Sequence, residues 1–302
     1  MTPAALARRN RTRIMLAFLA VYLVWGGTYL AIRFAVAVIP PFFMGATRML
    51  TAGLLLYAAV RLRGAPAPSL TDMRTAALSG LLMLGIGNGS VMWAAQVVPS
   101  GILSLIIAGV PLWMVVAEWL RPGGTRPRAH ALAGVGVGLV GITILIGPRI
   151  LGGGNVDPVG ALVLVLGSMS WAIGSVMSRH WPRPTSALIS VSLQIIAAGV
   201  AFAIASVVSG ELLRFGIDQL TTRAMLSWMY LVFGGSLIGY TAYVYLLSAV
   251  TPAKAATYAY VTPVIAVLVG WAFGGEALGP RTIAAASVIL ASVAITTGTQ
   301  GS

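Results

Sequence analysis

A succession of apolar runs, each long enough to form a bilayer-crossing helix, constrains this chain more than any other feature. Ten such runs follow one another with short gaps, at about residues 14–32, 42–60, 75–95, 101–119, 129–147, 158–178, 187–208, 224–247, 254–274 and 282–298. A helix needs roughly 20 apolar residues to span the hydrocarbon core. Only 8% of the residues are charged, against about 25% in soluble domains. The sequence therefore predicts an all-α integral membrane protein with ten transmembrane helices.

The second half of the chain repeats the first. A shift of 146 positions superposes Trp25 on Trp171, Arg33 on Arg179, and Arg48 on Gln194. Beyond the second run the shift becomes 153 and superposes Pro99 on Pro252, and Pro111 falls one residue from Pro263. Each half, residues 1–148 and 149–302, then holds five helices, and an odd number makes the second half enter the bilayer from the opposite side. Two inverted five-helix repeats are a plan that secondary transporters use for alternating access, although a duplication can also persist as a stable bundle.

The net charge of +13 comes from basic residues in the gaps between the runs. Such residues are topology signals rather than a nucleic-acid patch, because Lys and Arg in short loops favour the cytoplasmic side. With the N-terminus in the cytoplasm, that side receives Arg8, Arg9, Arg11, Arg13, Arg61, Arg63, Arg74, Arg121, Arg126, Arg128, Arg179, Arg183 and Lys254. We therefore expect a multi-pass protein of the cytoplasmic (inner) membrane with both termini in the cytoplasm. No nucleic-acid partner is expected.

No motif for a cofactor, a metal or catalysis is present. The chain has no cysteine and only two histidines, and it lacks the acidic, histidine or nucleophile clusters that membrane enzymes need. A membrane enzyme is the main rival class, and the sequence disfavours it. A channel is disfavoured because no ring of charges or repeated carbonyl filter is evident.

The order of several short motifs resembles the drug/metabolite transporter superfamily, in particular its EamA-like ten-helix branch. The motifs are Val24-Trp25-Gly26-Gly27-Thr28-Tyr29 with Arg33, Pro40-Pro41 with Arg48 and Ala52-Gly53, Pro99-Ser100-Gly101 with Pro111, and Thr251-Pro252-Ala253-Lys254 with Tyr260, Pro263 and Gly275-Glu276. The first half departs from the pattern, because Gly124 stands where Glu276 stands in the second.

The resemblance implies a membrane transporter, usually an exporter, of small metabolites such as amino acids or of amphipathic drugs. A lipid-linked or sugar metabolite flippase of the same superfamily is the nearer alternative. The resemblance also implies a cavity lined by the first, third, fourth, sixth, eighth and ninth helices, with the fifth and tenth behind them.

Polar and aromatic residues on those helices are the candidate cavity residues. Helical spacing places Trp25 with Thr28 or Tyr29 on one face, and Asn88 with Met92 and Gln96 on another. Aromatic faces suit cations and amphipathic solutes. The complete set of candidates is Trp25, Thr28, Tyr29, Asn88, Met92, Gln96, Trp113, Trp171, Ser175, Tyr240, Tyr243, Tyr258 and Tyr260.

Four prolines are the candidate hinges and gates. Pro111 and Pro263 fall near the middle of their runs, where proline leaves the carbonyl four residues earlier without its usual donor. Pro99 and Pro252 lie in very short hairpins that the topology places on opposite membrane faces. A static kink or an ordinary tight connection is the alternative for each.

Arg48 is the one basic residue well inside a run, and an intramembrane charge invites a functional interpretation. We expect a structural role instead, in which Arg48 snorkels or caps backbone carbonyls, because the second helix is peripheral in the family. Gln194 would be a weaker form of the same clamp. Carboxylates lie near run ends or in gaps, so facilitated diffusion or exchange is at least as plausible as a proton relay.

The fifth run carries a stripe of small residues, Gly134, Gly136, Gly138 and Gly141, which permits close helix approach. It predicts either a homodimer through the fifth or tenth helix or packing inside a monomer. The expected partners are thus a small-molecule substrate, the lipid bilayer and, in the first case, a second copy of the chain.

Overall fold

The computed structural model describes residues 3–94, 96–97, 106–124, 126, 129–151, 158–182, 184–274 and 280–298, and every regular element in these ranges is helical. The predicted all-α class is thereby confirmed. The unbroken helices are α1 (Pro3–Val36), α2 (Pro41–Leu62), α6 (Val110–Leu120), α7 (Ala129–Leu151), α8 (Pro158–His180), α9 (Ala187–Val208), α14 (Tyr258–Gly274) and α15 (Pro280–Gly298). The short elements α10 (Glu211–Arg214), η2 (Ile217–Gln219) and α13 (Pro252–Ala255) lie in connections.

Two long segments change helix type along their length. In each, a π-helical stretch separates two α-helices: α3 (Leu70–Gly80), η1 (Leu81–Asn88) and α4 (Gly89–Ala94), then α11 (Thr222–Tyr230), η3 (Leu231–Tyr240) and α12 (Thr241–Ala249). Segments of π-helix are rare and often occur at functional sites. They occupy matching places in the two halves, in the third and eighth predicted spans.

Six segments in the described part of the chain are long and apolar enough to cross a membrane: Asn10–Val36, Pro41–Leu62, Leu70–Ala94, Val159–His180, Ala187–Val208 and Thr222–Ala249. Three shorter apolar helices accompany them, Val110–Leu120, Leu132–Gly141 and Tyr258–Phe273. The fourth predicted run begins in residues outside the described part. A multi-pass membrane protein follows, and the full count of ten spans stays a prediction.

The start of α3 is fixed by a reciprocal capping box. The Ser69 Oγ accepts a hydrogen bond from the Asp72 amide at 3.0 Å, and the Asp72 carboxylate accepts one from the Ser69 amide at 3.0 Å. This cap starts the helix earlier than the apolar run alone predicts. The same carboxylate accepts a hydrogen bond from the Thr185 hydroxyl at 2.9 Å, which ties α3 to the connection between α8 and α9.

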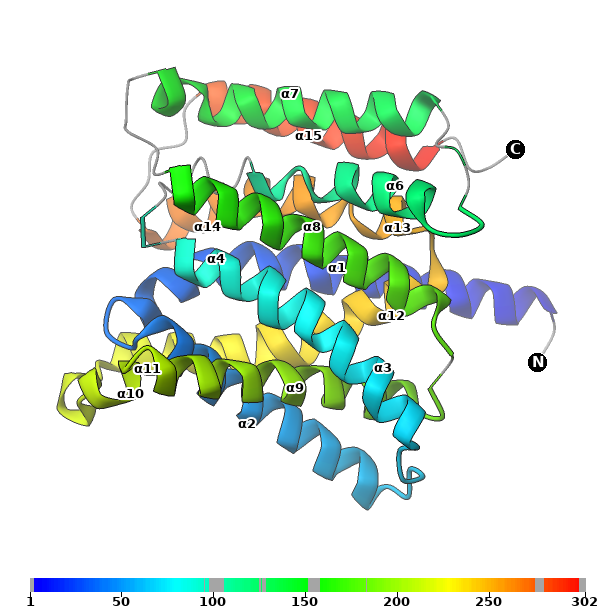
Figure 1. The fold of residues 1–302 in the computed structure, drawn as a ribbon. Coiled ribbons are helices and arrows are strands. Elements are labelled where there is room, and N and C mark those ends of the chain that lie inside the picture. Colours follow the sequence, from blue (N-terminus) through cyan, green and yellow to red (C-terminus); the bar gives the residue numbers. More distant parts are fainter. Residues whose placement is uncertain are drawn as a thin grey trace.

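The helices pack in pairs that match between the halves (Figure 1). α1 lies against α14 and against the α11–η3–α12 segment, while α8 lies against α6 and against the α3–η1–α4 segment. α2 pairs with α9, and α7 pairs with α15 along the opposite edge of the bundle. The first helix of each half thus packs against helices of the other half, and both halves contribute helices to the centre of the molecule.

The small-residue stripe of α7 is used inside the chain. Ser292 of α15 donates a hydrogen bond to the Gly134 carbonyl at 2.9 Å. A methyl group at Gly138 would lie 2.7 Å from both the Ser292 Oγ and the Tyr260 ring. At Gly136 a methyl group would meet nothing within 4 Å. A homodimer through α7 or α15 stays a prediction.

Candidate functional site

A cavity of about 90 Å³ lies at the centre of the bundle, between helices of both halves. Its wall comes from α1, α2, η1, α4, α6, α8, α9, η3 and α14, together with Ile107, and none of its described lining comes from α7 or α15. The wall is mostly aliphatic and aromatic. Its side chains with polar groups other than aromatic ones are Thr28, Arg48, Asn88, Ser168, Ser236 and Thr262. A largely apolar cavity with a few polar groups is typical of a small-molecule site.

About half of the predicted cavity residues line this cavity. They are Trp25, Thr28, Tyr29, Asn88, Trp171, Tyr240 and Tyr258. The structure places the following outside the lining: Met92, Gln96, Trp113, Ser175, Tyr243 and Tyr260.

The residues outside the lining have other positions. Gln96 is exposed, Trp113 is partly buried, and Met92 packs against α2, where a methyl group at Gly45 would lie 2.8 Å from its Cε. Tyr260 is buried and faces Gly138 of α7. Helical spacing alone does not separate a face toward the cavity from one toward a neighbouring helix.

Tyr243 and Ser175 support the aromatic wall from behind. The fully buried Tyr243 hydroxyl accepts a hydrogen bond from the Trp171 Nε1 at 3.0 Å and lies 2.8 Å from the Ser175 Oγ. Ser175 itself donates to the Trp171 carbonyl at 2.7 Å, so Tyr243 donates to Ser175. These bonds fix the indole ring of Trp171 against the cavity.

Rings from both halves form one aromatic cluster, defined as Trp25, Trp171, Tyr240, Tyr243 and Tyr258. The Trp25 ring lies 5.7 Å from Trp171, 5.2 Å from Tyr243 and 4.8 Å from Tyr258, measured between centroids. Tilted and edge-to-face pairs at these distances are favourable beyond the area they bury. The two tryptophans superposed by the sequence repeat thus meet in the middle of the molecule.

Both π-helical stretches receive a side-chain hydrogen bond from the helix packed against them. The Trp25 Nε1 donates to the Gly235 carbonyl of η3 at 3.1 Å, and the Ser170 Oγ donates to the Leu82 carbonyl of η1 at 2.8 Å. The wider π turn changes the regular backbone ladder, and a polar side chain can bond a carbonyl there. No pattern in the sequence predicted these π-helical stretches.

Arg48 differs most from its prediction. It is buried, 4% exposed, and lines the cavity instead of snorkelling to a membrane surface. Its Nε donates to the Ser236 Oγ of η3 at 2.9 Å, and its Nη1 is buried without a hydrogen-bond partner. The expectation that the second helix is peripheral is wrong on this face, because α2 also contributes Met49 to the wall. An intramembrane charge was the signal that could have found this residue.

Gln194 also has a specific partner. Its Oε1 accepts a hydrogen bond from the Tyr240 hydroxyl at 2.6 Å, and its Nε2 donates to the Ser190 Oγ at 3.2 Å. Gln194 therefore fixes the Tyr240 ring of the cavity wall from α9. The sequence repeat assigns it the position on α9 that Arg48 has on α2.

Of the four predicted hinge and gate prolines, Pro111 lies differently from its prediction. Pro111 is in the first turn of α6, because the chain turns at Ala108–Gly109 just before it. Proline is well tolerated there, since the first-turn amides have no partner in the helix. Pro263 is inside α14 as expected, five residues after that helix begins. Pro252 begins α13, and Pro99 lies outside the described residues.

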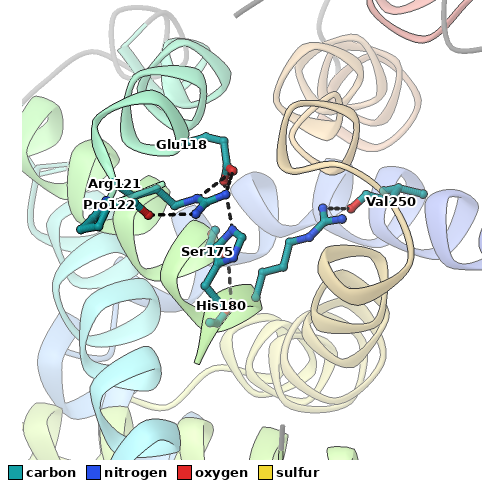
Figure 2. Close-up of polar contacts among 8 residues, drawn as sticks. Glu118, Arg121, Pro122, Ser175, His180 and Val250 are labelled. Carbon is teal, nitrogen blue, oxygen red and sulfur yellow. Dashed lines mark hydrogen bonds and ion pairs between the residues drawn. The ribbon is translucent and has the colours of Figure 1, made fainter. Parts of the chain in front are cut away.

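Polar contacts join helix ends beyond the aromatic cluster (Figure 2). The Glu118 carboxylate of α6 pairs with the Arg121 Nη2 at 2.6 Å and lies 3.3 Å from the His180 Nε2 at the end of α8. Arg179 donates to the Val250 carbonyl, which joins α8 to the segment after α12. Nearby, the Tyr22 hydroxyl of α1 lies 2.8 Å from the Thr257 Oγ1. These contacts join helix ends at the end of the bundle nearest the start of α1 (Figure 1).

Comparison with known proteins gives consistent relatives. A family model described as the EamA-like transporter family matches residues 12–147 and 158–298. The chain is 40% identical to the uncharacterized inner membrane transporter YedA of Escherichia coli K12, over 93% of this chain and 89% of that protein. It is 23% identical to a probable amino-acid metabolite efflux pump of Salmonella typhimurium, over 92% of each chain. A crystal structure 21% identical in sequence superposes with a TM-score of 0.76, over 95% of this chain and 98% of the other, which shows the fold alone.

Proposed function

Because this chain belongs to the EamA-like transporter family of the drug/metabolite transporter superfamily, we propose that it is a secondary transporter. In this proposal it exports small metabolites, such as amino acids, or amphipathic drugs across the inner membrane by alternating access. The observation that carries the proposal is the central cavity, because its wall is built from both halves of the chain.

The matched packing of the two halves supports the inverted-repeat part of the proposal. α1 against η3 has its counterpart in α8 against η1, and both contacts include a side-chain bond to a π-helical carbonyl. Two equivalent halves can exchange conformations and so expose a shared midplane site to one side and then the other. We propose ten spans in two inverted halves on this basis.

The basic residues in the gaps between the runs support an orientation of the chain in the membrane. We propose that the N-terminus and C-terminus are cytoplasmic, which agrees with the beginning of α1 and the end of α15 lying at the same end of the bundle (Figure 1). The contacts of Glu118 with His180, of Arg179 with Val250, and of Tyr22 with Thr257 then form a closed cytoplasmic gate. Export requires these contacts to open so that solute can enter from the cytoplasm.

The relatives support the substrate class. One of them is named a probable amino-acid metabolite efflux pump. The aromatic cluster offers flat apolar surfaces to an amphipathic solute, and the polar wall residues offer a few fixed hydrogen-bond groups. Such a wall selects solutes that carry both an apolar part and a charged or polar part.

Reconstitution of the full chain in liposomes tests the proposal. Flux of a panel of labelled amino acids and aromatic cations is measured with and without an imposed pH gradient. We expect saturable flux of some panel members, and no flux of any member would refute the substrate class. Flux that does not respond to the pH gradient would argue against proton coupling and for facilitated diffusion or exchange.

Cysteine accessibility tests the mechanism separately. The natural chain contains no cysteine, so a single introduced cysteine reports one position without further changes. A cysteine replacing Ser168 in the cavity wall should react with impermeant thiol reagents from either side in turn, as substrate gradients are reversed. Reaction from one side under every condition would contradict alternating access.

A further inference from the structure

Arg48 is a buried cation whose charge has no counterion in the described part of the chain. The described acidic side chains have other positions: Asp72 accepts from Ser69 and Thr185, Glu118 from Arg121 and His180, Glu211 from the Phe43 amide, and Asp218 is exposed on η2. Among the described residues, the guanidinium makes one side-chain hydrogen bond, from its Nε to the neutral Ser236.

Arg48 belongs to the cavity lining. Its Nη1 is buried without a partner, and its Nη2 lies beside Gly235, where a methyl group would come within 3.0 Å. The absence of a side chain at Gly235 thus leaves room for the guanidinium. A buried charge without partner is strongly unfavourable unless something pairs with it during the working cycle. A planar guanidinium matches a carboxylate, which it can bind through two parallel hydrogen bonds.

We propose that Arg48 binds the carboxylate of the transported solute. This inference rests on the proposed function and narrows it to solutes that carry a carboxylate next to an apolar or aromatic part. The Ser236 hydroxyl holds the Nε edge, so the Nη edge is presented to the solute. The rings of Trp25, Trp171 and Tyr258, which line the same cavity, cover the apolar part.

A second group in the wall fits the other end of an amino acid. The Asn88 Oδ1 is buried without a hydrogen-bond partner and belongs to the same cavity lining. A carbonyl oxygen accepts hydrogen bonds from an ammonium group. A free donor at Arg48 and a free acceptor at Asn88 together favour a zwitterion over a simple anion.

Three labelled probes that share a phenylethyl frame test the assignment in liposomes that contain the full chain. They are L-phenylalanine, 3-phenylpropionate, which lacks the ammonium, and 2-phenylethylamine, which lacks the carboxylate. We expect kcat/KM of the wild type to be at least about 10-fold higher for both acids than for the amine, which corresponds to one charge-assisted hydrogen bond. Preference for the amine, or equal values for all three, would overturn the proposal even if no variant could be purified.

Substitution of the arginine provides the second arm. Arg48→Gln should raise KM for both acids by about 10-fold or more and leave flux of the amine unchanged, whereas Arg48→Lys should retain part of the acid flux. The matched control is Arg33→Gln, because Arg33 is exposed on α1 and is not part of the lining. It should behave as the wild type with all three probes.

The outcomes separate this inference from the proposed function. Equal loss of all three fluxes in Arg48→Gln, with normal insertion and thermal stability, would indicate a structural role and overturn the proposal. Flux of the amine alone, in the wild type and Arg48→Gln alike, would leave transport standing and overturn the carboxylate site. Loss confined to the two acids supports it.

Discussion

Replacing Tyr243 by phenylalanine removes one buried oxygen and leaves the ring of the aromatic cluster in place. The hydroxyl is fully buried and bonds to the Trp171 Nε1 at 3.0 Å and to the Ser175 Oγ at 2.8 Å. Ser175 keeps its bond to the Trp171 carbonyl at 2.7 Å, but the indole N–H loses its acceptor. Leaving a buried donor unsatisfied costs about 1–3 kcal/mol.

We therefore expect Tyr243→Phe to lower the free energy of unfolding by about 2 kcal/mol, or roughly 30-fold in the equilibrium constant. The matched control lies two residues away on the same helix. The Tyr245 hydroxyl bonds to the Asn10 Oδ1 at 3.2 Å in an exposed position, where water can replace the bond, so Tyr245→Phe should cost less than about 0.5 kcal/mol.

Equilibrium unfolding of both variants in mixed micelles measures the difference. A double-mutant cycle of Tyr243→Phe with Ser175→Ala should return a coupling energy of about 1 kcal/mol, because the two hydroxyls are in contact. If Tyr243→Phe is no less stable than Tyr245→Phe, the hydrogen-bonded support behind Trp171 does not contribute as argued, and the reasoning is refuted.

Two further substitutions test how the helices are fixed, each measured by the same unfolding assay. Gly80→Ala should lower the free energy of unfolding by about 1–3 kcal/mol, because its new methyl group would lie 2.2 Å from the Gln194 carbonyl oxygen of α9. The control is Gly136→Ala, whose methyl group meets nothing within 4 Å. It should leave the free energy of unfolding unchanged or raise it by about 0.5–1 kcal/mol through helix propensity. Asp72→Ala should cost about 1–2 kcal/mol, because it removes both the capping box at the start of α3 and the bond to Thr185; a change below 0.3 kcal/mol would show that the cap is dispensable.

The positions of long helices, the internal repeat and the family could be predicted from the sequence. The runs at 42–60 and 187–208 correspond closely to α2 (Pro41–Leu62) and α9 (Ala187–Val208), because bilayer-length hydropathy reports helix position directly. The repeat also brought out Trp25 and Trp171, and the structure places the two rings in contact. Family membership likewise followed from short motifs and is confirmed.

Features that depend on packing between distant helices could not be predicted. Arg48 stands on a helix whose other face is peripheral, and only the approach of η3 turns its guanidinium into part of the cavity wall. Met92 and Asn88 share a helix face, yet Asn88 lines the cavity and Met92 packs against α2. The turn before Pro111 places that proline in a first helical turn, although the apolar run continues through it.

The π-helical stretches also constrain which changes in chain length the protein tolerates. A π turn holds one more residue than an α turn, so it behaves as a single-residue insertion that the helix has absorbed. Deletion of one residue between Leu81 and Asn88 would let η1 close toward regular α-helix and would keep α3 and α4 in phase with each other. Such a deletion would remove the widened turns in which the Leu82 carbonyl accepts the hydrogen bond from Ser170 of α8. Gene variants that are one codon shorter in η1 or η3 are therefore expected to fold, but to lose the contact of α8 with η1 or of α1 with η3 that the wider turns provide.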